Sequence, residues 1–138
     1  MRKSIQIGLL GLGTVGTGVA RMLMENRGIL EARLGVPLML KYIADIDLER
    51  DRGLQLDGSL LTSDAFQVVN DPEVDIVVEM IGGDGIAREL ILKALENGKP
   101  VVTANKALLA KHGNQLFKNA MDNGVDLAYE ASVGGCMP

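Results

Sequence analysis

The feature that most restricts the fold of this chain is a glycine-rich segment, GLGTVG at residues 11–16, which follows an apolar stretch at residues 4–10. We call this segment the glycine turn. Between a strand and a helix, Gly11 permits the tight reversal, Gly13 lets a pyrophosphate approach the backbone, and Gly16 lets the helix pack closely on its strand. The free N–H groups at that helix start suit phosphate binding. Glycines also serve in ordinary turns, but the order of strand, turn and helix predicts a dinucleotide-binding unit.

Segments of strand and helix character alternate along the rest of the chain. The strand-like segments are short and apolar, and the helical ones repeat apolar residues every three or four positions. We expect strands at residues 4–10, 38–44, 66–69, 74–81, 101–103 and 126–130. We expect helices directly after the glycine turn and at residues 28–34, 87–97, 106–111 and 115–122, with a loop and a short helix within residues 47–63. The alternation predicts a Rossmann-type α/β fold, with a doubly wound, mainly parallel sheet and helices on both faces.

Three residues are expected to mark helix ends. Asn105 fits an N-cap, Gly98 stands where a left-handed C-cap belongs, and His112, followed by Gly113, fits a C-terminal capping side chain. In the helix predicted last, the residues expected to face the core are Leu116, Phe117, Ala120 and Met121.

Composition and charge limit the classes of partner. The 138 residues suffice for one domain, which we place at residues 1–130. A net charge of −4, without a basic run interleaved with aromatic residues, argues against a nucleic-acid partner. No segment has the length of a membrane span, and the apolar stretch near the N-terminus, broken by Gln6, does not fit a signal peptide. The single cysteine, Cys136, fits a reducing cytoplasm.

Open α/β sheets bind ligands beyond the carboxyl ends of their strands, which we call the carboxyl edge. The predicted strands place there residues 11–16, Asp45, residues 81–83, residues 103–106 and residues 130–135. Gly82 and Gly83 could form a plain flexible loop. Their lack of Cβ atoms also permits close approach of a ribose or nicotinamide, which is the interpretation we favour.

Asp45 ends the predicted second strand, from where a carboxylate reaches the ribose hydroxyls of an adenosine. Such a carboxylate repels a 2′-phosphate, which favours NAD over NADP. The alternative interpretation of Asp45 is an ordinary turn aspartate. Arg50 and Arg52 follow closely and could still contact a phosphate.

Lys106 follows the predicted strand at residues 101–103, where its ammonium could meet a cofactor phosphate or a substrate oxygen. The alternative is an exposed lysine without a role in binding. Cys136 has no second cysteine or arranged histidine, so we assign it no chemistry. The sequence also lacks a histidine and cysteine cluster, so any metal ion would be hard and oxygen-bound, near Glu130.

Four separated motifs, in order and at suitable spacing, give the chain a specific resemblance. They are GLLGLGTVG at residues 8–16, DPEVDIVVE at residues 71–79 with IGG at residues 81–83, VVTANKALL at residues 101–109, and YEASVGG at residues 129–135. Together they resemble homoserine dehydrogenase and cover nearly the whole chain. The resemblance implies the N-terminal nucleotide-binding domain of an enzyme of threonine and methionine biosynthesis. That enzyme interconverts L-homoserine and L-aspartate 4-semialdehyde by hydride transfer with NAD or NADP.

The resemblance also implies roles for single residues. Lys106 would contact the cofactor and border the substrate site, as an auxiliary catalytic residue. A sodium-type ion would be held by the Glu130 carboxylate and by the backbone carbonyls of Val133, Gly135 and Met137. From the carboxyl edge and the resemblance together, the predicted cofactor-binding residues are Gly11, Gly13, Thr14, Val15, Gly16, Asp45, Ile81, Gly82, Gly83, Thr103, Asn105, Lys106 and Ser132.

The chain departs from the family pattern at two places. Members that prefer NADP usually carry an arginine after the position of Asp45, where this chain has Ile46, and this weakens the case for NADP. The family usually has Gly-Ile-Pro after Gly135, whereas this chain has Cys136, Met137 and Pro138. That change removes the freedom of a glycine beside the predicted ion ligands.

The family's substrate-binding and dimer-forming domain would follow residue 138. We therefore interpret residues 131–138 as the start of a connection to it, and expect a full-length homodimer or larger assembly acting on a small-molecule substrate. The chain alone is expected to bind nucleotide weakly and to turn nothing over. Two alternatives stay open: a stand-alone dinucleotide-sensing module acting through a partner protein, and the cofactor domain of another NAD-dependent amino-acid dehydrogenase.

Overall fold

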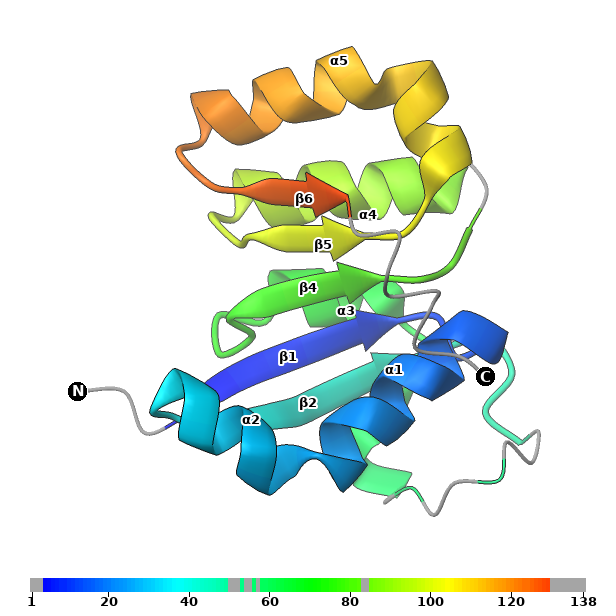
Figure 1. The fold of residues 1–138 in the computed structure, drawn as a ribbon. Coiled ribbons are helices and arrows are strands. Elements are labelled where there is room, and N and C mark those ends of the chain that lie inside the picture. Colours follow the sequence, from blue (N-terminus) through cyan, green and yellow to red (C-terminus); the bar gives the residue numbers. More distant parts are fainter. Residues whose placement is uncertain (1–3, 50–52, 54–55, 57, 83–84, 130–138) are drawn as a thin grey trace.

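The computed structural model describes residues 4–49, 53, 56, 58–82 and 85–129. Within these residues the strands form one parallel sheet in the order β3-β2-β1-β4-β5-β6 (Figure 1). The strands are β1 (Ile5–Leu10), β2 (Leu38–Ala44), β3 (Leu61–Thr62), β4 (Ile76–Glu79), β5 (Val101–Thr103) and β6 (Leu127–Tyr129). The prediction of a doubly wound parallel sheet is confirmed.

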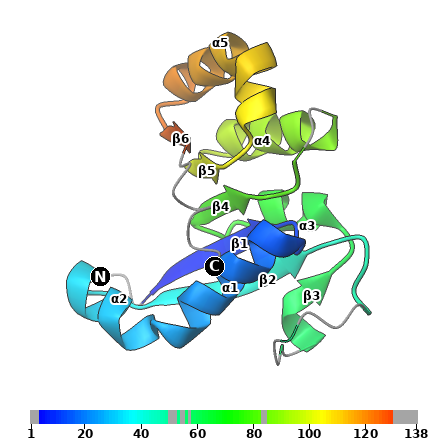
Figure 2. The same cartoon turned by 45° about the vertical axis from the view of Figure 1, so that its right-hand side comes forward.

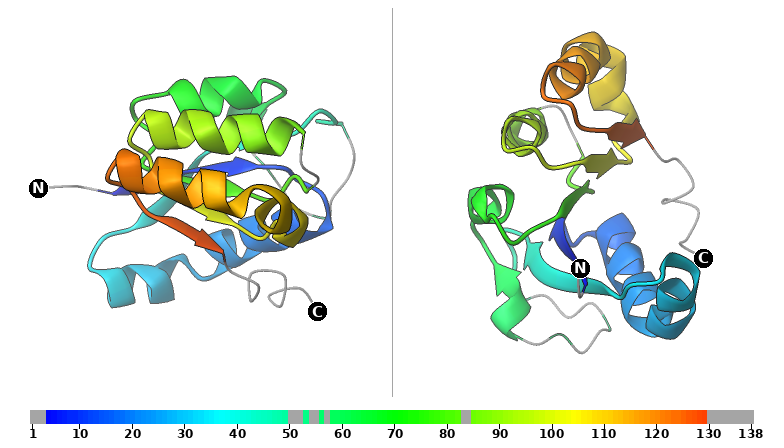
Figure 3. Two further views of the ribbon diagram at one scale, coloured as in Figure 1. Left: turned by 90° about the horizontal axis from the view of Figure 1, so that it is seen from above. Right: turned by 90° about the vertical axis from the view of Figure 1, so that its left-hand side faces the viewer.

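Helices cover both faces of this sheet. They are α1 (Thr14–Glu25), α2 (Arg27–Leu34), α3 (Ala65–Asn70), α4 (Ile86–Glu96) and α5 (Lys106–Asp122), with a 3₁₀ turn η1 (Gly58–Leu60) before β3. The right-hand view of Figure 3 shows α1 and α2 on one face and α3 and α4 on the other, where α5 packs beside α4. None of the described helices is both long enough and apolar enough to cross a membrane.

The order of the strands defines where a ligand can bind. From β1 the chain adds β2 and β3 on one side, then returns to add β4, β5 and β6 on the other. Figure 2 shows β3 and β6 far apart at the two margins of the sheet. The strand order therefore reverses between β1 and β4, and the crevice beyond their carboxyl ends is the position at which such sheets bind ligands.

The core is aliphatic and has one layer on each face of the sheet. Residues of β1 alternate between the layers: Ile7 and Leu9 pack with α1, whereas Leu10 packs with the layer of α3, α4 and α5. At Gly8 the helix α3 comes close, because a Cβ built there would lie 2.3 Å from Val68 Cγ1. This position therefore requires a glycine, which the sequence pattern did not indicate.

The expectation of a strand at residues 66–69 is wrong, because this segment forms α3. Its N-cap is Asp64, whose Oδ1 accepts hydrogen bonds from the backbone N–H groups of Phe66 and Gln67 at 3.1 and 3.3 Å. That cap favours a helix over the strand that two adjacent valines suggest. The third strand along the chain lies earlier, at Leu61–Thr62, inside the segment expected to be a loop with a short helix.

The expectation of two helices at residues 106–111 and 115–122 is also wrong, because α5 is continuous across them. His112 therefore does not cap a helix end. Leu116 and Ala120 face the core as expected, but Phe117 and Met121 are exposed. The expected cap at the start of α5 is confirmed: Asn105 Oδ1 accepts a hydrogen bond from Leu108 N–H at 3.0 Å.

Candidate functional site

The glycine turn joins β1 to α1 at the centre of the carboxyl edge. Gly11 has φ +96°, and a Cβ built on it would lie 2.9 Å from the backbone of Met80 and Ile81. A Cβ on Gly16 would lie 1.9 Å from Gly11 O. The protein's own backbone thus requires glycine at both positions.

Gly13 differs from its two neighbours in the turn. A Cβ built on Gly13 would meet no protein atom within 4 Å, and the residue has φ −76°. Gly13 is the N-cap of α1, which has no acidic side chain in its first turn. The fold therefore does not require a glycine here, and the open space at a helix start fits a phosphate group that approaches the backbone.

Asp45 lies at the end of β2 and holds the glycine turn in place. Its Oδ2 accepts a hydrogen bond from Leu12 N–H at 2.6 Å, and its Oδ1 accepts one from Asp47 N–H at 2.9 Å. Ala44 O, one residue earlier, accepts a hydrogen bond from Gly11 N–H at 2.7 Å. The carboxylate is half-buried and stands at the position from which such a side chain reaches ribose hydroxyls.

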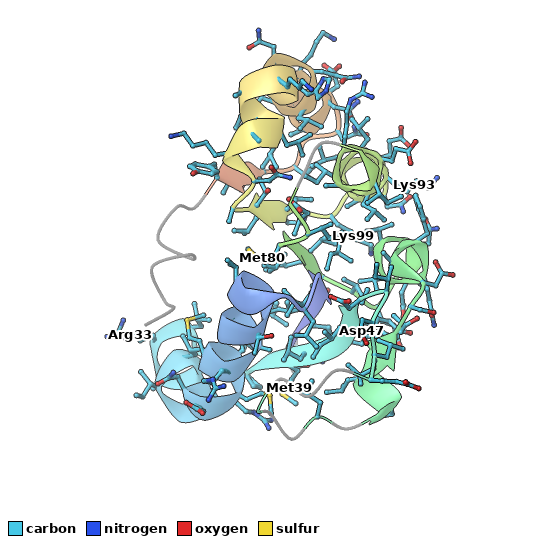
Figure 4. The ribbon with its side chains drawn as sticks, turned by 90° about the vertical axis from the view of Figure 1, so that its right-hand side faces the viewer. Arg33, Met39, Asp47, Met80, Lys93 and Lys99 are labelled. Atoms are coloured by element: carbon cyan, nitrogen blue, oxygen red, sulfur yellow. The ribbon has the colours of Figure 1, made fainter. Side chains whose placement is uncertain are left out.

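A cavity of about 560 Å³ opens beside Asp45. Its lining includes Gly11 and Gly13 together with apolar side chains from the end of β2 and from the starts of α3 and α4, among them Ile46, Phe66 and Ile86. This size and lining suit part of a nucleotide, with a flat base between apolar side chains. Figure 4 looks onto this edge, with Met80 near the start of α1 and Asp47 on the β2 side.

Phe66 and Ile86 line the cavity, although the sequence pattern predicts neither as a site residue. The pattern predicts a strand at Phe66, and Ile86 stands just before the helix expected at residues 87–97. A usable signal was Asp64, since an aspartate two residues before Phe66 marks a helix start and so places Phe66 at the carboxyl edge.

A buried carboxylate at the end of β4 was also missed. The Glu79 side chain is fully buried, and its Oε2 accepts hydrogen bonds from Ile81 N–H at 2.8 Å and Gly82 N–H at 3.2 Å. Its Oε1 accepts a hydrogen bond from the hydroxyl of Thr103, at the end of β5. Glu79 thus fixes the first residues after β4 and joins them to β5.

The cavity extends past the strand reversal to Met80 and Ile81 after β4, and the remaining predicted site residues lie beyond it, at the end of β5 and the start of α5. Thr103 and Asn105 are buried, and Lys106 is exposed at the first position of α5. Neither Thr103, Asn105 nor Lys106 is among the residues that line the cavity. The carboxyl edge therefore has two parts, the cavity beside Asp45 and the segment that carries Lys106.

Several predicted residues lie outside the part of the chain that the structure describes. They are Gly83, Glu130, Ser132, Val133, Gly135 and Met137, with Arg50, Arg52 and Cys136. Among the described residues, no group of three or more histidine, cysteine, aspartate or glutamate side chains could hold a metal ion. The sodium site stays a prediction.

Comparison with known proteins identifies the family. Residues 11–130 match the family model described as homoserine dehydrogenase, NAD binding domain. The chain is 42% identical over 136 residues to the homoserine dehydrogenase of Bacillus subtilis, covering 99% of this chain and 31% of that protein. Its fold matches a crystal structure of Staphylococcus aureus homoserine dehydrogenase with a TM-score of 0.87 and 41% identity, over 96% of this chain and 33% of that one.

A more distant match carries a nucleotide. A hyperthermophilic archaeal homoserine dehydrogenase in complex with NADPH matches with a TM-score of 0.74 and 25% identity, over 94% of this chain and 44% of that chain. The chain spans about a third of the length of the curated relatives it matches, at 31% for the B. subtilis protein. By its sequence and its fold, the chain belongs to the homoserine dehydrogenase family and is its NAD-binding domain.

Proposed function

We propose that this chain binds the dinucleotide of a homoserine dehydrogenase that interconverts L-homoserine and L-aspartate 4-semialdehyde. The observation that carries the proposal is the open space at Gly13, at the start of α1 and beside Asp45 and the cavity. The residues present therefore fit a dinucleotide.

Each part of the carboxyl edge suits one part of the dinucleotide. The N-terminus of α1 would hold the pyrophosphate, Asp45 the adenosine ribose, and the cavity the adenine. Gly82, Thr103, Asn105 and Lys106 would face the other half, near the substrate. When bound, NAD or NADP supplies hydride transfer. The Lys106 ammonium would orient a phosphate or substrate oxygen and stabilise negative charge on it.

Calorimetry of the 138-residue chain with NAD tests the proposal. We expect a measurable, weak binding isotherm and an increase in the melting temperature. A folded sample that shows neither heat nor a thermal shift with NAD or NADP would contradict it.

We further propose that NAD binds more tightly than NADP. The Asp45 carboxylate would repel a 2′-phosphate, and Ile46, which is 95% exposed, offers that phosphate no cation. The archaeal relative in complex with NADPH shows that the family also includes a protein that binds the other cofactor. We expect Asp45→Ala to lower the ratio of NAD to NADP affinity in calorimetry, and an unchanged ratio would contradict the assignment.

The family resemblance supports three further proposals about the longer protein. Residues 1–130 would form the dinucleotide domain, and residues 131–138 would lead to a substrate domain that makes it a homodimer or larger. A sodium-type ion would bind Glu130 and the carbonyls of Val133, Gly135 and Met137, with Ser132 near the cofactor. The single cysteine supports a cytoplasmic location.

A further inference from the structure

Glu79 is unusual because a carboxylate at the end of β4 is fully buried and is satisfied on both oxygens. Burying a carboxylate is unfavourable unless its oxygens receive hydrogen bonds. Here the donors come from two separate segments: the backbone after β4, at Ile81 and Gly82, and the hydroxyl of Thr103 at the end of β5. The side chain therefore fastens these two segments to each other.

The direction of each hydrogen bond is determined by its atoms. The backbone N–H groups of Ile81 and Gly82 can only donate. Thr103 Oγ1 accepts a hydrogen bond from Asn105 N–H at 3.0 Å, so its own proton is free to be donated to Glu79 Oε1. Every partner of the Glu79 side chain is a donor, and the side chain acts as an acceptor alone.

This chain of hydrogen bonds ends at the segment that carries Lys106. Asn105 stands two residues after Thr103 and caps α5 through its side chain, and Lys106 is the first residue of that helix. The carboxylate that accepts hydrogen bonds from residues 81 and 82 is thus linked through Thr103 to the residue that caps α5. Both segments lie at the carboxyl edge, on the β4 and β5 side of the strand reversal.

The two halves of a dinucleotide fall on opposite sides of that reversal. With the adenosine beside Asp45 and the pyrophosphate at α1, the nicotinamide riboside would extend toward the ends of β4 and β5. We propose that Glu79 is a positioning residue: it sets the placement of the segment with Asn105 and Lys106 relative to the end of β4, and thereby the affinity for the nicotinamide riboside half. This inference rests on the proposed function.

Two substitutions of almost unchanged shape test the proposal. Glu79→Gln keeps the size of the side chain but puts an amide NH₂ opposite either the two backbone donors or the Thr103 hydroxyl. Thr103→Val keeps the branched shape and removes the hydroxyl, which leaves Asn105 N–H without that acceptor. Glu73→Gln is the matched control, because Glu73 is 67% exposed in its side chain and precedes β4 at the opposite end of that strand.

The affinities for NAD and for ADP are measured by calorimetry on the folded 138-residue chain. ADP contains the adenosine and both phosphates but lacks the nicotinamide riboside. We expect Glu79→Gln and Thr103→Val each to weaken NAD binding about tenfold, because a buried donor or acceptor loses its partner. Thr103→Val should weaken ADP binding less than twofold. Glu79→Gln also disturbs the bond to Ile81, which lines the cavity, and should weaken ADP binding by a smaller factor than NAD binding. The double variant should lose little more than the larger single loss, since both changes break one network. Thr103→Ser, which restores the hydroxyl, should recover most of the NAD affinity.

A role in folding alone would give a different result. It would lower the affinities for NAD and ADP by the same factor, or lower only the melting temperature, and either outcome overturns the inference. Additive losses in the double variant also overturn it. If Glu79→Gln does not fold, the ratio of NAD affinity to ADP affinity in Thr103→Val tests the inference without it. If the unmodified chain binds neither NAD nor ADP, the proposed function itself is overturned. If the unmodified chain binds both and the variants keep its ratio of NAD affinity to ADP affinity, only the role of Glu79 is overturned.

Discussion

The two ends of the sheet each hold a buried charged side chain, and they use it in opposite ways. At the carboxyl edge, the Glu79 carboxylate accepts hydrogen bonds from N–H groups after β4. At the other end, which we call the amino edge, Lys99 before β5 is buried, and its Nζ donates to Asp71 O and Val74 O at 2.7 Å each. At one end the Glu79 carboxylate accepts hydrogen bonds from backbone N–H groups, and at the other the Lys99 ammonium donates hydrogen bonds to backbone carbonyls.

We expect the difference between the two edges to separate ligand binding from stability. The segments at the carboxyl edge border an open cavity and the unfilled space at Gly13. At the amino edge, Lys99 and the carbonyls it binds tie the turn between α3 and β4 to the start of β5. Burial lowers the pKa of Lys99, while the nearby carboxylates of Asp71 and Asp75 partly oppose that shift. We therefore expect changes at the amino edge to alter stability without altering ligand affinity.

The largest effect is expected for a substitution at Gly16, which should lower both stability and NAD affinity. In Gly16→Ala the new Cβ would lie 1.9 Å from Gly11 O, so α1 must move away from the turn. We expect the free energy of unfolding to fall by about 3 kcal/mol or more, with loss of NAD binding. Denaturant unfolding and calorimetry measure both. Gly28→Ala in α2, where a Cβ meets nothing within 4 Å, is the control and should be neutral or stabilising.

Lys99→Met should affect stability alone. It fills the space but leaves the carbonyls of Asp71 and Val74 without the ammonium, at a cost of about 2 kcal/mol in unfolding free energy. NAD affinity should change less than twofold. Lys118→Met is the control, because the Lys118 side chain is 76% exposed and its ion pair is with the exposed Asp122. A large loss of NAD affinity in folded Lys99→Met would contradict the expectation that changes at the amino edge alter stability alone.

Gly13→Ala should give the reverse pattern. The added methyl meets no protein atom, and φ at this residue suits alanine, so unfolding free energy should change by less than about 1 kcal/mol. The methyl would occupy the space assigned to the pyrophosphate, and we expect NAD affinity to fall about tenfold. Full NAD affinity in this variant would mean that the phosphates lie elsewhere.

The smallest effect is a pH dependence at the amino edge. The backbone N–H of Glu73 donates to the Asp71 carboxylate at 2.8 Å and is the main cause that lowers the pKa of Asp71 below its usual value. The resulting stabilisation is present above the unfolded-state pKa and is lost as the pH falls through the lower folded-state pKa. Asp71→Asn should therefore be slightly less stable than the unmodified chain at neutral pH. The difference in unfolding free energy between the two should close below about pH 4. Unfolding curves at several pH values measure this difference, and a difference that grows in acid contradicts the prediction.

Local sequence patterns were enough to predict several strands, turns and helix ends of the fold. The glycine turn, the β-branched run that forms β4, and the cap at Asn105 depend on residues close together in the sequence. They were predicted correctly in type, although β4 is shorter than its expected range. The same holds for Gly98, which has the expected left-handed conformation with φ +75°.

Contacts between distant residues explain what was missed. Gly8 is required by Val68, which stands 60 residues later, and Glu79 is satisfied by Thr103, 24 residues later. The two residues of β3 become a strand only by pairing with Ile43 and Ala44 of β2. The sequence around Asp45 predicted a ligand for ribose but not its hydrogen bond to Leu12, 33 residues earlier.

The most direct test of the central claim is a titration of the isotope-labelled 138-residue chain with NAD, followed by amide NMR shifts. We predict saturable shifts at the glycine turn, around Asp45 and at the start of α5, with little change around Lys99 and Asp71. Shifts centred on the amino edge, or none at NAD concentrations in the millimolar range, would contradict the assignment of the carboxyl edge as the dinucleotide site.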